Sequence, residues 1–170
     1  KAIKPYVSKV YTDKYGNLIA FKKGSGPKVM LSAHMDEVGL MIKSIDNKGV
    51  IYCSEIGGVE PMTLLGERVM VETKSKPIYG IITTHEISNA EVIDKMPKME
   101  DLVIDTGLSK KELLKRGVQI GSYAYFTVNA NCLGCGDIIS GKALDDRIGC
   151  FVLVEVAKLI KNSKNNVYFV

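Results

Sequence analysis

Two separated stretches of the chain contain the side chains most able to do chemistry. The segment LSAHMDEVG carries His34 and Asp36, and the segment GKALDDRIG carries Asp145, Asp146 and Arg147. Imidazole nitrogens and carboxylate oxygens are the usual protein ligands of divalent metal ions such as zinc. The two segments together therefore predict a metal site built from two distant parts of the chain.

The first segment offers one imidazole and one carboxylate at a spacing of two residues. Side chains two apart on an extended strand point to the same face, so Asp36 can reach the ring of His34. A metal-bound imidazole usually has its second nitrogen held by a carboxylate, which fixes the tautomer and the ring orientation. This favours His34 as a ligand and Asp36 as the residue that orients it. An ordinary core or surface histidine is the alternative, because short motifs produce many false matches.

The second segment places two carboxylates directly before a run of apolar residues. Charged carboxylates beside a buried segment are costly unless they are paired or bind a metal. One of Asp145 and Asp146 could bridge two divalent cations while the other joins a supporting network with Arg147. The alternative is an aspartate that caps the helix N-terminus, with a surface ion pair beside it, because aspartate is a favoured N-cap residue.

Three further features are weaker candidates for a site. Cys132 and Cys135 have the spacing of a zinc-ligand pair, but no second pair follows, and their glycine-rich surroundings do not predict the helix of a thioredoxin-like motif. Incidental thiols are the favoured interpretation. Cys150 lies in an apolar run, which predicts a buried thiol. His85 has no partner at ligand spacing and is interpreted as a surface or structural residue.

Composition excludes several classes of function. The chain has 170 residues, four cysteines and a net charge of +4. Residues 1–30 are rich in lysine, but they do not interleave a stacking platform for bases. We therefore predict a solvated face, with a subunit contact as the alternative, and no nucleic-acid partner. No apolar run approaches the ~20 residues that a bilayer span needs. Few cysteines without a disulfide framework favour a reducing compartment, so the predicted location is cytoplasmic, away from any membrane.

The order of predicted elements indicates an α/β domain interrupted by a β-rich module. Residues 11–21 predict two strands around a turn, and residues 28–33 predict a buried strand that ends just before His34. Short strands separated by turns recur over 39–130, with strands predicted at 39–45, 50–53, 68–73, 78–83 and 123–128. One helix is predicted to begin at Ser109 and to end before Gly117. Such spacing is typical of a small barrel or sandwich. We therefore assign 1–38 and 131–170 to the α/β domain and 39–130 to an inserted domain.

The C-terminal part of the α/β domain is predicted to be a connector, a helix and a strand. Residues 131–136 are glycine-rich and predict a flexible connector. Residues 146–161 are apolar nearly all round, which predicts a deeply buried helix. Residues 167–170 read as the start of the next strand. Because the chain begins without a methionine and ends inside this strand, we expect it to be a fragment of a longer protein or the ordered part of one.

The two motifs, together with GERV at 66–69 and EDLVIDTG at 100–107, closely resemble the tetrahedral (TET-type) dinuclear metalloaminopeptidases, whose sequences were long labelled endoglucanases. The resemblance runs in order over nearly the whole chain. It implies a catalytic α/β domain, with a mixed sheet flanked by helices, and an inserted small β-barrel or PDZ-like dimerisation domain. It also implies a homo-oligomer in which dimers assemble into a tetrahedral dodecamer.

The same resemblance implies a site with two divalent metal ions, zinc or cobalt. His34 would bind one metal, Asp145 would bridge both, and Asp36 would serve the catalytic centre by orienting His34. Asp146 and Arg147 would support the site. In this family the peptide bond after the bridging aspartate is often cis, which predicts a cis bond between Asp145 and Asp146.

The activity implied by the resemblance is hydrolysis of N-terminal residues from peptides by a metal-activated water. The family also uses a glutamate pair, a further acidic ligand and a late histidine, all normally beyond the strand at 167–170. The 170 residues alone are therefore expected to be inactive. The alternatives are a glycoside hydrolase, following the old label, and a non-catalytic assembly module if the fragment acts alone.

Overall fold

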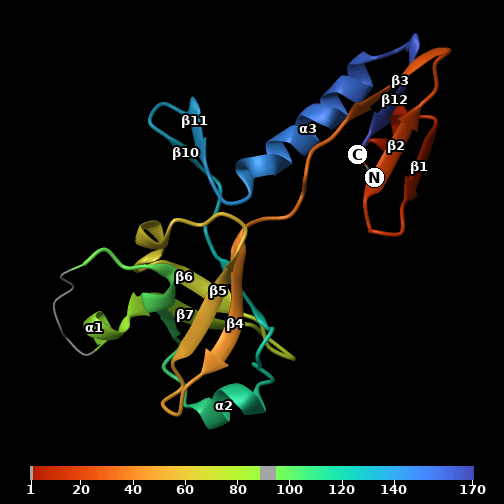
Figure 1. Cartoon of the computed structure of the whole chain (residues 1–170). Coiled ribbons are helices and arrows are strands. Elements are labelled where there is room, and N and C mark those ends of the chain that lie inside the picture. Colours follow the sequence, from red (N-terminus) through yellow and green to blue (C-terminus); the bar gives the residue numbers. More distant parts are fainter. Residues whose placement is uncertain (1, 89–94) are drawn as a thin grey trace. The chain divides into compact units, whose positions relative to one another are not determined.

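The computed structural model describes residues 2–88 and 95–170, and these divide into two compact units (Figure 1). Unit 1 combines Lys1–Glu37 with Ala143–Val170, and unit 2 is the continuous segment Val38–Lys142. The division after residue 142 places the segment 131–142 with unit 2, whereas the sequence-based boundary was set at 131. The catalytic and dimerisation roles of the two parts stay predictions.

Unit 1 is built on a mixed four-stranded sheet with the order β1-β2-β12-β3. β12 pairs antiparallel with β2 and parallel with β3, which makes the sheet mixed as expected. The four strands are β1 (Lys9–Thr12), β2 (Leu18–Lys22), β3 (Gly26–Leu31) and β12 (Asn165–Phe169).

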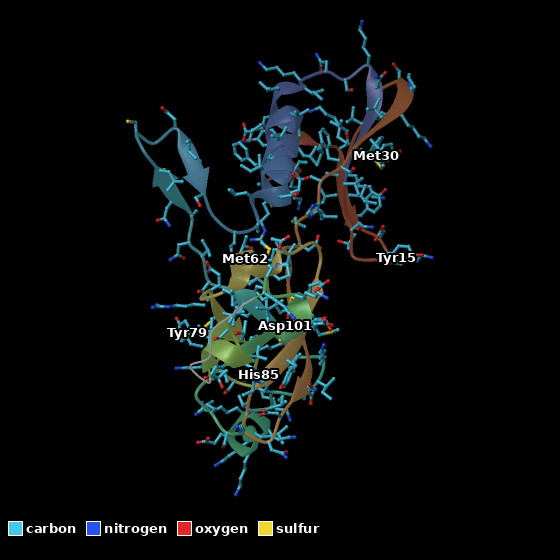
Figure 2. All side chains as sticks on the ribbon, turned by 60° about the vertical axis from the view of Figure 1, so that its left-hand side comes forward. Tyr15, Met30, Met62, Tyr79, His85 and Asp101 are labelled. Carbon is cyan, nitrogen blue, oxygen red and sulfur yellow. The ribbon has the colours of Figure 1, made fainter. Side chains whose placement is uncertain are left out.

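The β1–β2 hairpin confirms the two strands predicted over 11–21. The Asp13 carboxylate closes the turn by accepting hydrogen bonds from the backbone N–H groups of Tyr15 and Asn17. Gly16 takes a positive φ of 94°, a conformation that glycine adopts without steric cost. Tyr15 marks this turn in Figure 2.

One long helix, α3 (Leu144–Leu159), packs on the core of unit 1. Ala157 is its fully buried residue, and Leu153, Val154 and Val156 pack against buried side chains of β2 and β12. A short 3-10 helix, η1 (Lys4–Tyr6), follows the buried Ile3. Helix α3 therefore buries only one of its faces against the core of unit 1.

The predicted deep burial of this helix is wrong for the described chain. Ile148, Phe151, Val152 and Leu159 of α3 are exposed. The apolar pattern runs all round the helix, but the described residues supply packing partners for only one side of it. Cys150, predicted to be buried, is half-buried on the same helix.

Unit 2 is dominated by a closed six-stranded barrel with the order β4-β5-β8-β7-β6-β9, which confirms the barrel alternative. The likeness to a PDZ domain stays a prediction. The strands are β4 (Gly39–Ile45), β5 (Ile51–Ile56), β6 (Arg68–Val71), β7 (Ile78–Thr84), β8 (Leu102–Asp105) and β9 (Tyr123–Phe126).

The barrel core follows the two-residue period of its strands. On β4, Leu40 and Ile42 are buried while Met41 between them is exposed, and on β7 the same alternation separates Ile82 from Ile81. Every strand of the barrel except β8 was predicted from the sequence. A short run of three apolar residues was the available signal for β8, and its pairing with β5 and β7 closes the barrel there.

Helices of unit 2 are short. The predicted helix after Ser109 is α2 (Lys110–Lys115), where the Ser109 and Glu112 side chains form the expected capping box. Hydrogen bonds from Ser109 hold the pKa of the Glu112 carboxyl below its usual value. The other helical segments are α1 (His85–Ser88), η2 (Pro61–Leu64) and η3 (Met99–Asp101).

The segment predicted to be a flexible connector forms a hairpin instead. β10 (Asn131–Leu133) and β11 (Ile138–Ser140) pair antiparallel in a two-stranded sheet of their own. Glycines at 134 and 136 suggested flexibility, but both take positive φ values and shape a tight turn between the strands.

Candidate metal centre

His34 follows strand β3 at the carboxyl end of the sheet. Parallel pairing extends past the strand, since the Ala33 N–H donates to the Val170 carbonyl at 3.0 Å and the Val170 N–H donates to the Leu31 carbonyl at 2.9 Å. These bonds fix the backbone immediately before the histidine. The carboxyl end of parallel strands is the edge at which α/β sheets commonly bind ligands.

The structure brings His34 together with a carboxylate from each motif. Asp36 Oδ1 lies 3.3 Å from His34 Nδ1, and Asp145 Oδ1 lies 3.2 Å from His34 Nε2. The imidazole side chain remains 56% exposed. One ring nitrogen is therefore held by a carboxylate, and the other faces an oxygen that could share a metal with it.

The start of α3 sets the position of the two aspartates. Ala143 adopts a left-handed conformation with φ of 59°, the Asp145–Asp146 peptide bond is cis, and both aspartates have non-helical backbone angles. The cis bond confirms the prediction drawn from the family resemblance. Regular helical geometry begins only after this segment.

Asp146 caps the helix, while Asp145 does not. The Asp146 Oδ1 atom accepts a hydrogen bond of 3.0 Å from the Gly149 N–H, the pattern of an N-terminal capping residue. The N-cap interpretation of the acidic pair therefore holds for Asp146, and Asp145 is left as the candidate metal ligand. Asp145 faces His34, and Asp146 satisfies the helix end.

Two other side chains of α3 hold the backbone of the first motif. Arg147 Nε donates to the Met35 carbonyl at 2.9 Å, and the Cys150 thiol donates to the His34 carbonyl at 3.3 Å. Arg147 was predicted to join a supporting network, but its carbonyl acceptor was not predicted. Cys150 was predicted only to be a buried thiol, and not to hold the backbone at His34. The spacing of Cys150 from the acidic pair, about one helical turn, was the only available signal.

Gly149 leaves room for the cap, because a β-carbon placed there would clash with the Asp146 carboxylate. We expect Asp146→Ala, which removes the cap and keeps Gly149, to lower the free energy of unfolding by about 1 kcal/mol, the usual cost of losing an N-cap. Urea denaturation of both proteins measures this difference. An unchanged midpoint would contradict the capping role of Asp146, and Gly149→Ala should lose less, because the higher helix propensity of alanine offsets about 1 kcal/mol.

The charges around His34 act on its titration. Partial desolvation lowers the pKa of His34, but the Asp36 carboxylate and the two aspartates of α3 outweigh it, so the pKa lies above its ordinary value. A metal ion needs the neutral imidazole and therefore competes with protons at this position.

The motif side chains line an open cavity of about 700 Å³ within unit 1. His34, Asp36, Asp146 and Cys150 contribute to its polar side. Apolar residues of α3 and of the sheet, among them Leu153, line the remainder. A cavity of this size is in the range of small-molecule and peptide-residue sites.

The donor set fits a divalent metal ion only in part. An imidazole nitrogen with a carboxylate oxygen beside it, and a second carboxylate on the other ring nitrogen, is the chemistry of a zinc ligand pair with its orienting residue. Among residues 2–88 and 95–170, no group of three or more His, Cys, Asp and Glu side chains could hold a metal ion. The described residues therefore offer only two candidate ligands, His34 and Asp145, for such a site.

Known sequences resemble the chain over nearly all of its length. A lysyl aminopeptidase of Pyrococcus furiosus is 33% identical over 172 residues, which cover 99% of this chain and 49% of the relative. A protein of Acetivibrio thermocellus assigned as an aminopeptidase is 37% identical over 170 residues, covering 99% of this chain and 48% of the relative. The chain thus spans about half the length of the curated relatives it matches.

Solved structures give the same result. An aminopeptidase from the archaeon Desulfurococcus kamchatkensis matches with a TM-score of 0.85 and 35% identity, over 99% of this chain and 47% of that one. The TET1 peptidase of Pyrococcus horikoshii matches with a TM-score of 0.81 and 31% identity, over 99% of this chain and 51% of that one. A Thermotoga maritima protein described as an endoglucanase matches with a TM-score of 0.76 and 35% identity, over 99% of this chain and 50% of that one.

The family model for M42 glutamyl aminopeptidases matches residues 16–170, which include both motifs and the barrel. The chain therefore belongs to the M42 glutamyl aminopeptidase family.

Proposed function

We propose that the protein containing this chain is a metal-dependent aminopeptidase that removes N-terminal residues from peptides. The observation that carries the proposal is the contact of His34 Nε2 with Asp145 Oδ1, with Asp36 on the opposite ring nitrogen. The membership in the M42 family and the names of its relatives support the same reaction.

Each motif residue has one task in this proposal. His34 and Asp145 would hold the metal, with Asp145 shared between two ions of zinc or cobalt, and Asp36 would keep the His34 ring in the correct tautomer. Arg147 would hold the backbone between His34 and Asp36 through the Met35 carbonyl. When bound, such a pair of ions lowers the pKa of a water molecule and polarises the scissile carbonyl.

The remaining machinery is proposed to come from a segment with no counterpart in these 170 residues. Two side chains do not hold two ions tightly, and no group of three or more possible metal ligands occurs among the described residues. The family resemblance assigns the general base and the other ligands to a following segment. The relatives, which are about twice as long, have room for it.

The quaternary structure is proposed from the relatives as well. The TET1 peptidase of Pyrococcus horikoshii assembles into a tetrahedron or a large octahedral shell. We infer that this protein forms a homo-oligomer in which the barrel, the proposed dimerisation domain, contacts a second subunit.

No helix in the described part of the chain is long and apolar enough to cross a membrane. A cytoplasmic location stays a prediction.

A glycoside hydrolase is the second candidate, and the resemblance to a protein described as an endoglucanase is the observation that favours it. Such enzymes need two carboxyl groups that flank the sugar, about 5–5.5 or 6.5–9.5 Å apart. In this structure the Asp145 carboxylate contacts His34 and the Asp146 carboxylate caps α3. The sequence also has no tryptophan to stack on a sugar ring. The peptidase is therefore favoured.

One assay separates the two reactions. The purified full-length protein that contains this chain, tested on aminoacyl-p-nitroanilides, should release nitroaniline, lose this activity on chelation and regain it with zinc or cobalt. A substrate with an acetylated amine should not be cleaved, because an aminopeptidase requires a free N-terminus. Hydrolysis of soluble cellulose that survives chelation, without nitroanilide release, would contradict the proposal and support the glycosidase.

A further inference from the structure

The segment that carries His34 lies just beyond the regular part of the sheet. The Ala33 N–H still bonds to the Val170 carbonyl, but residues 34–38 belong to no helix or strand. Burial does not anchor these side chains in the described chain, because those of His34 and Asp36 are 56% and 89% exposed and Met35 is exposed as well. The position of the His34 imidazole therefore depends on the groups that hold its backbone.

Two side chains of α3 supply such a hold. The Cys150 thiol donates to the His34 carbonyl at 3.3 Å, and Arg147 Nε donates to the Met35 carbonyl at 2.9 Å. Residues three apart lie on the same face of a helix, so these two donors reach two successive peptide groups from one face of α3. Asp145, the other candidate ligand, lies at the start of the same helix. The two contacts therefore tie the backbone of one ligand to the helix that carries the other.

The charge of Arg147 gives its contact a distinct signature. A guanidinium repels a divalent cation, so by charge alone Arg147 would lower the affinity of the proposed centre for metal. By holding the Met35 carbonyl, the same side chain would raise that affinity. The two effects have opposite signs, and a variant that removes the guanidinium shows which of them dominates.

We propose that Cys150 is a positioning residue of the metal centre, which acts with Arg147 to hold the backbone of His34 so that its Nε2 atom faces Asp145. The proposal rests on the metal-dependent function proposed above. Cys150 is not a ligand in this assignment, because its thiol donates to the carbonyl. Loss of a group that orients a ligand costs about 10–100-fold in metal affinity, and we expect about 10-fold for Cys150 because it acts through the backbone.

The zinc affinity of the full-length protein tests the role of Cys150, measured by competition with a chromogenic chelator. Cys150→Ala removes the donor and should bind zinc about 10-fold more weakly, whereas Cys150→Ser keeps a donor and should recover most of the loss. An effect on the helix alone would give the reverse order, because alanine is the better helix former and buries no polar group. The order of the two variants therefore separates positioning from packing.

Arg147→Met tests the second contact, since it keeps much of the side-chain stem and removes the donor and the charge. We expect weaker zinc binding than in the unchanged protein, with Arg147→Lys intermediate because an ammonium group can still donate to the Met35 carbonyl. The matched control is Cys132→Ala, which removes an exposed thiol of unit 2 and should leave the zinc affinity unchanged.

The outcomes distinguish this inference from the proposed function. Unchanged zinc affinity in Cys150→Ala overturns the positioning role, as does tighter binding by Cys150→Ala than by Cys150→Ser. Tighter binding by Arg147→Met overturns the part assigned to Arg147. If the unchanged protein binds no zinc and cobalt gives the same result, the metal-dependent function itself fails, and the positioning role fails with it.

Discussion

His34→Ala is expected to abolish both tight metal binding and peptide hydrolysis by the protein that contains this chain. Among the described residues, the His34 imidazole is the only candidate nitrogen ligand of the proposed site, and its Nε2 atom lies 3.2 Å from Asp145 Oδ1. Loss of a residue that merely orients a ligand costs about 10–100-fold in metal affinity or activity, so loss of the ligand should exceed about 100-fold. Metal content after dialysis and the rate of nitroanilide release measure the two effects.

The chain supplies its own control for this variant. Its second histidine, His85, begins α1 in unit 2 (Figure 2). The His85 Nε2 atom lies 2.6 Å from the Tyr52 hydroxyl. His85→Ala should retain metal and activity. Since His34 is largely exposed, its truncation should leave the thermal unfolding temperature of the metal-free protein unchanged. Retention of metal by His34→Ala would refute the ligand assignment.

Ile82→Ala is expected to give the largest loss of stability, with little change at the metal centre. Ile82 is 1% exposed inside the barrel, and its truncation leaves a cavity beside Ile104, its partner on β8. Substitutions of this kind cost about 2–5 kcal/mol. Urea denaturation followed by circular dichroism measures the change in the free energy of unfolding.

The neighbouring residue on the same strand is the matched control. Ile81 is 51% exposed on the outer face of β7, so Ile81→Ala should change the free energy of unfolding by no more than about 0.5 kcal/mol. Equal losses for the two variants would mean that the barrel does not have the described inward and outward alternation.

The sequence predicted the parts of the fold that depend on local patterns. The hairpin around Asp13, the capping box at Ser109 and five of the barrel strands follow from turn residues, capping chemistry and alternation. β8 was missed because three apolar residues between polar neighbours are too short for a periodic signal. It becomes a strand by pairing with β5 and β7, which is information from distant residues.

The candidate site divides in the same way. Residue types alone indicated His34, Asp36 and the acidic pair, but only the fold shows that Asp145 faces His34 while Asp146 caps α3. The contact between Cys150 and the His34 carbonyl joins residues 116 apart, and no local rule predicts it. The prediction that α3 is deeply buried was wrong for a related reason. An apolar pattern shows which faces of a helix can be buried, but not which packing partners are present.

The division into a continuous and a discontinuous unit has a consequence for synthesis on the ribosome. The barrel unit occupies one uninterrupted stretch, Val38–Lys142, so all its strands have been made before α3 begins. Unit 1 must wait, because β3 pairs with β12 and the Ala33 N–H bonds to the carbonyl of Val170. At about 5–20 residues per second, the whole barrel unit has therefore been made about 1 to 6 seconds before the strand that fixes the His34 segment is complete.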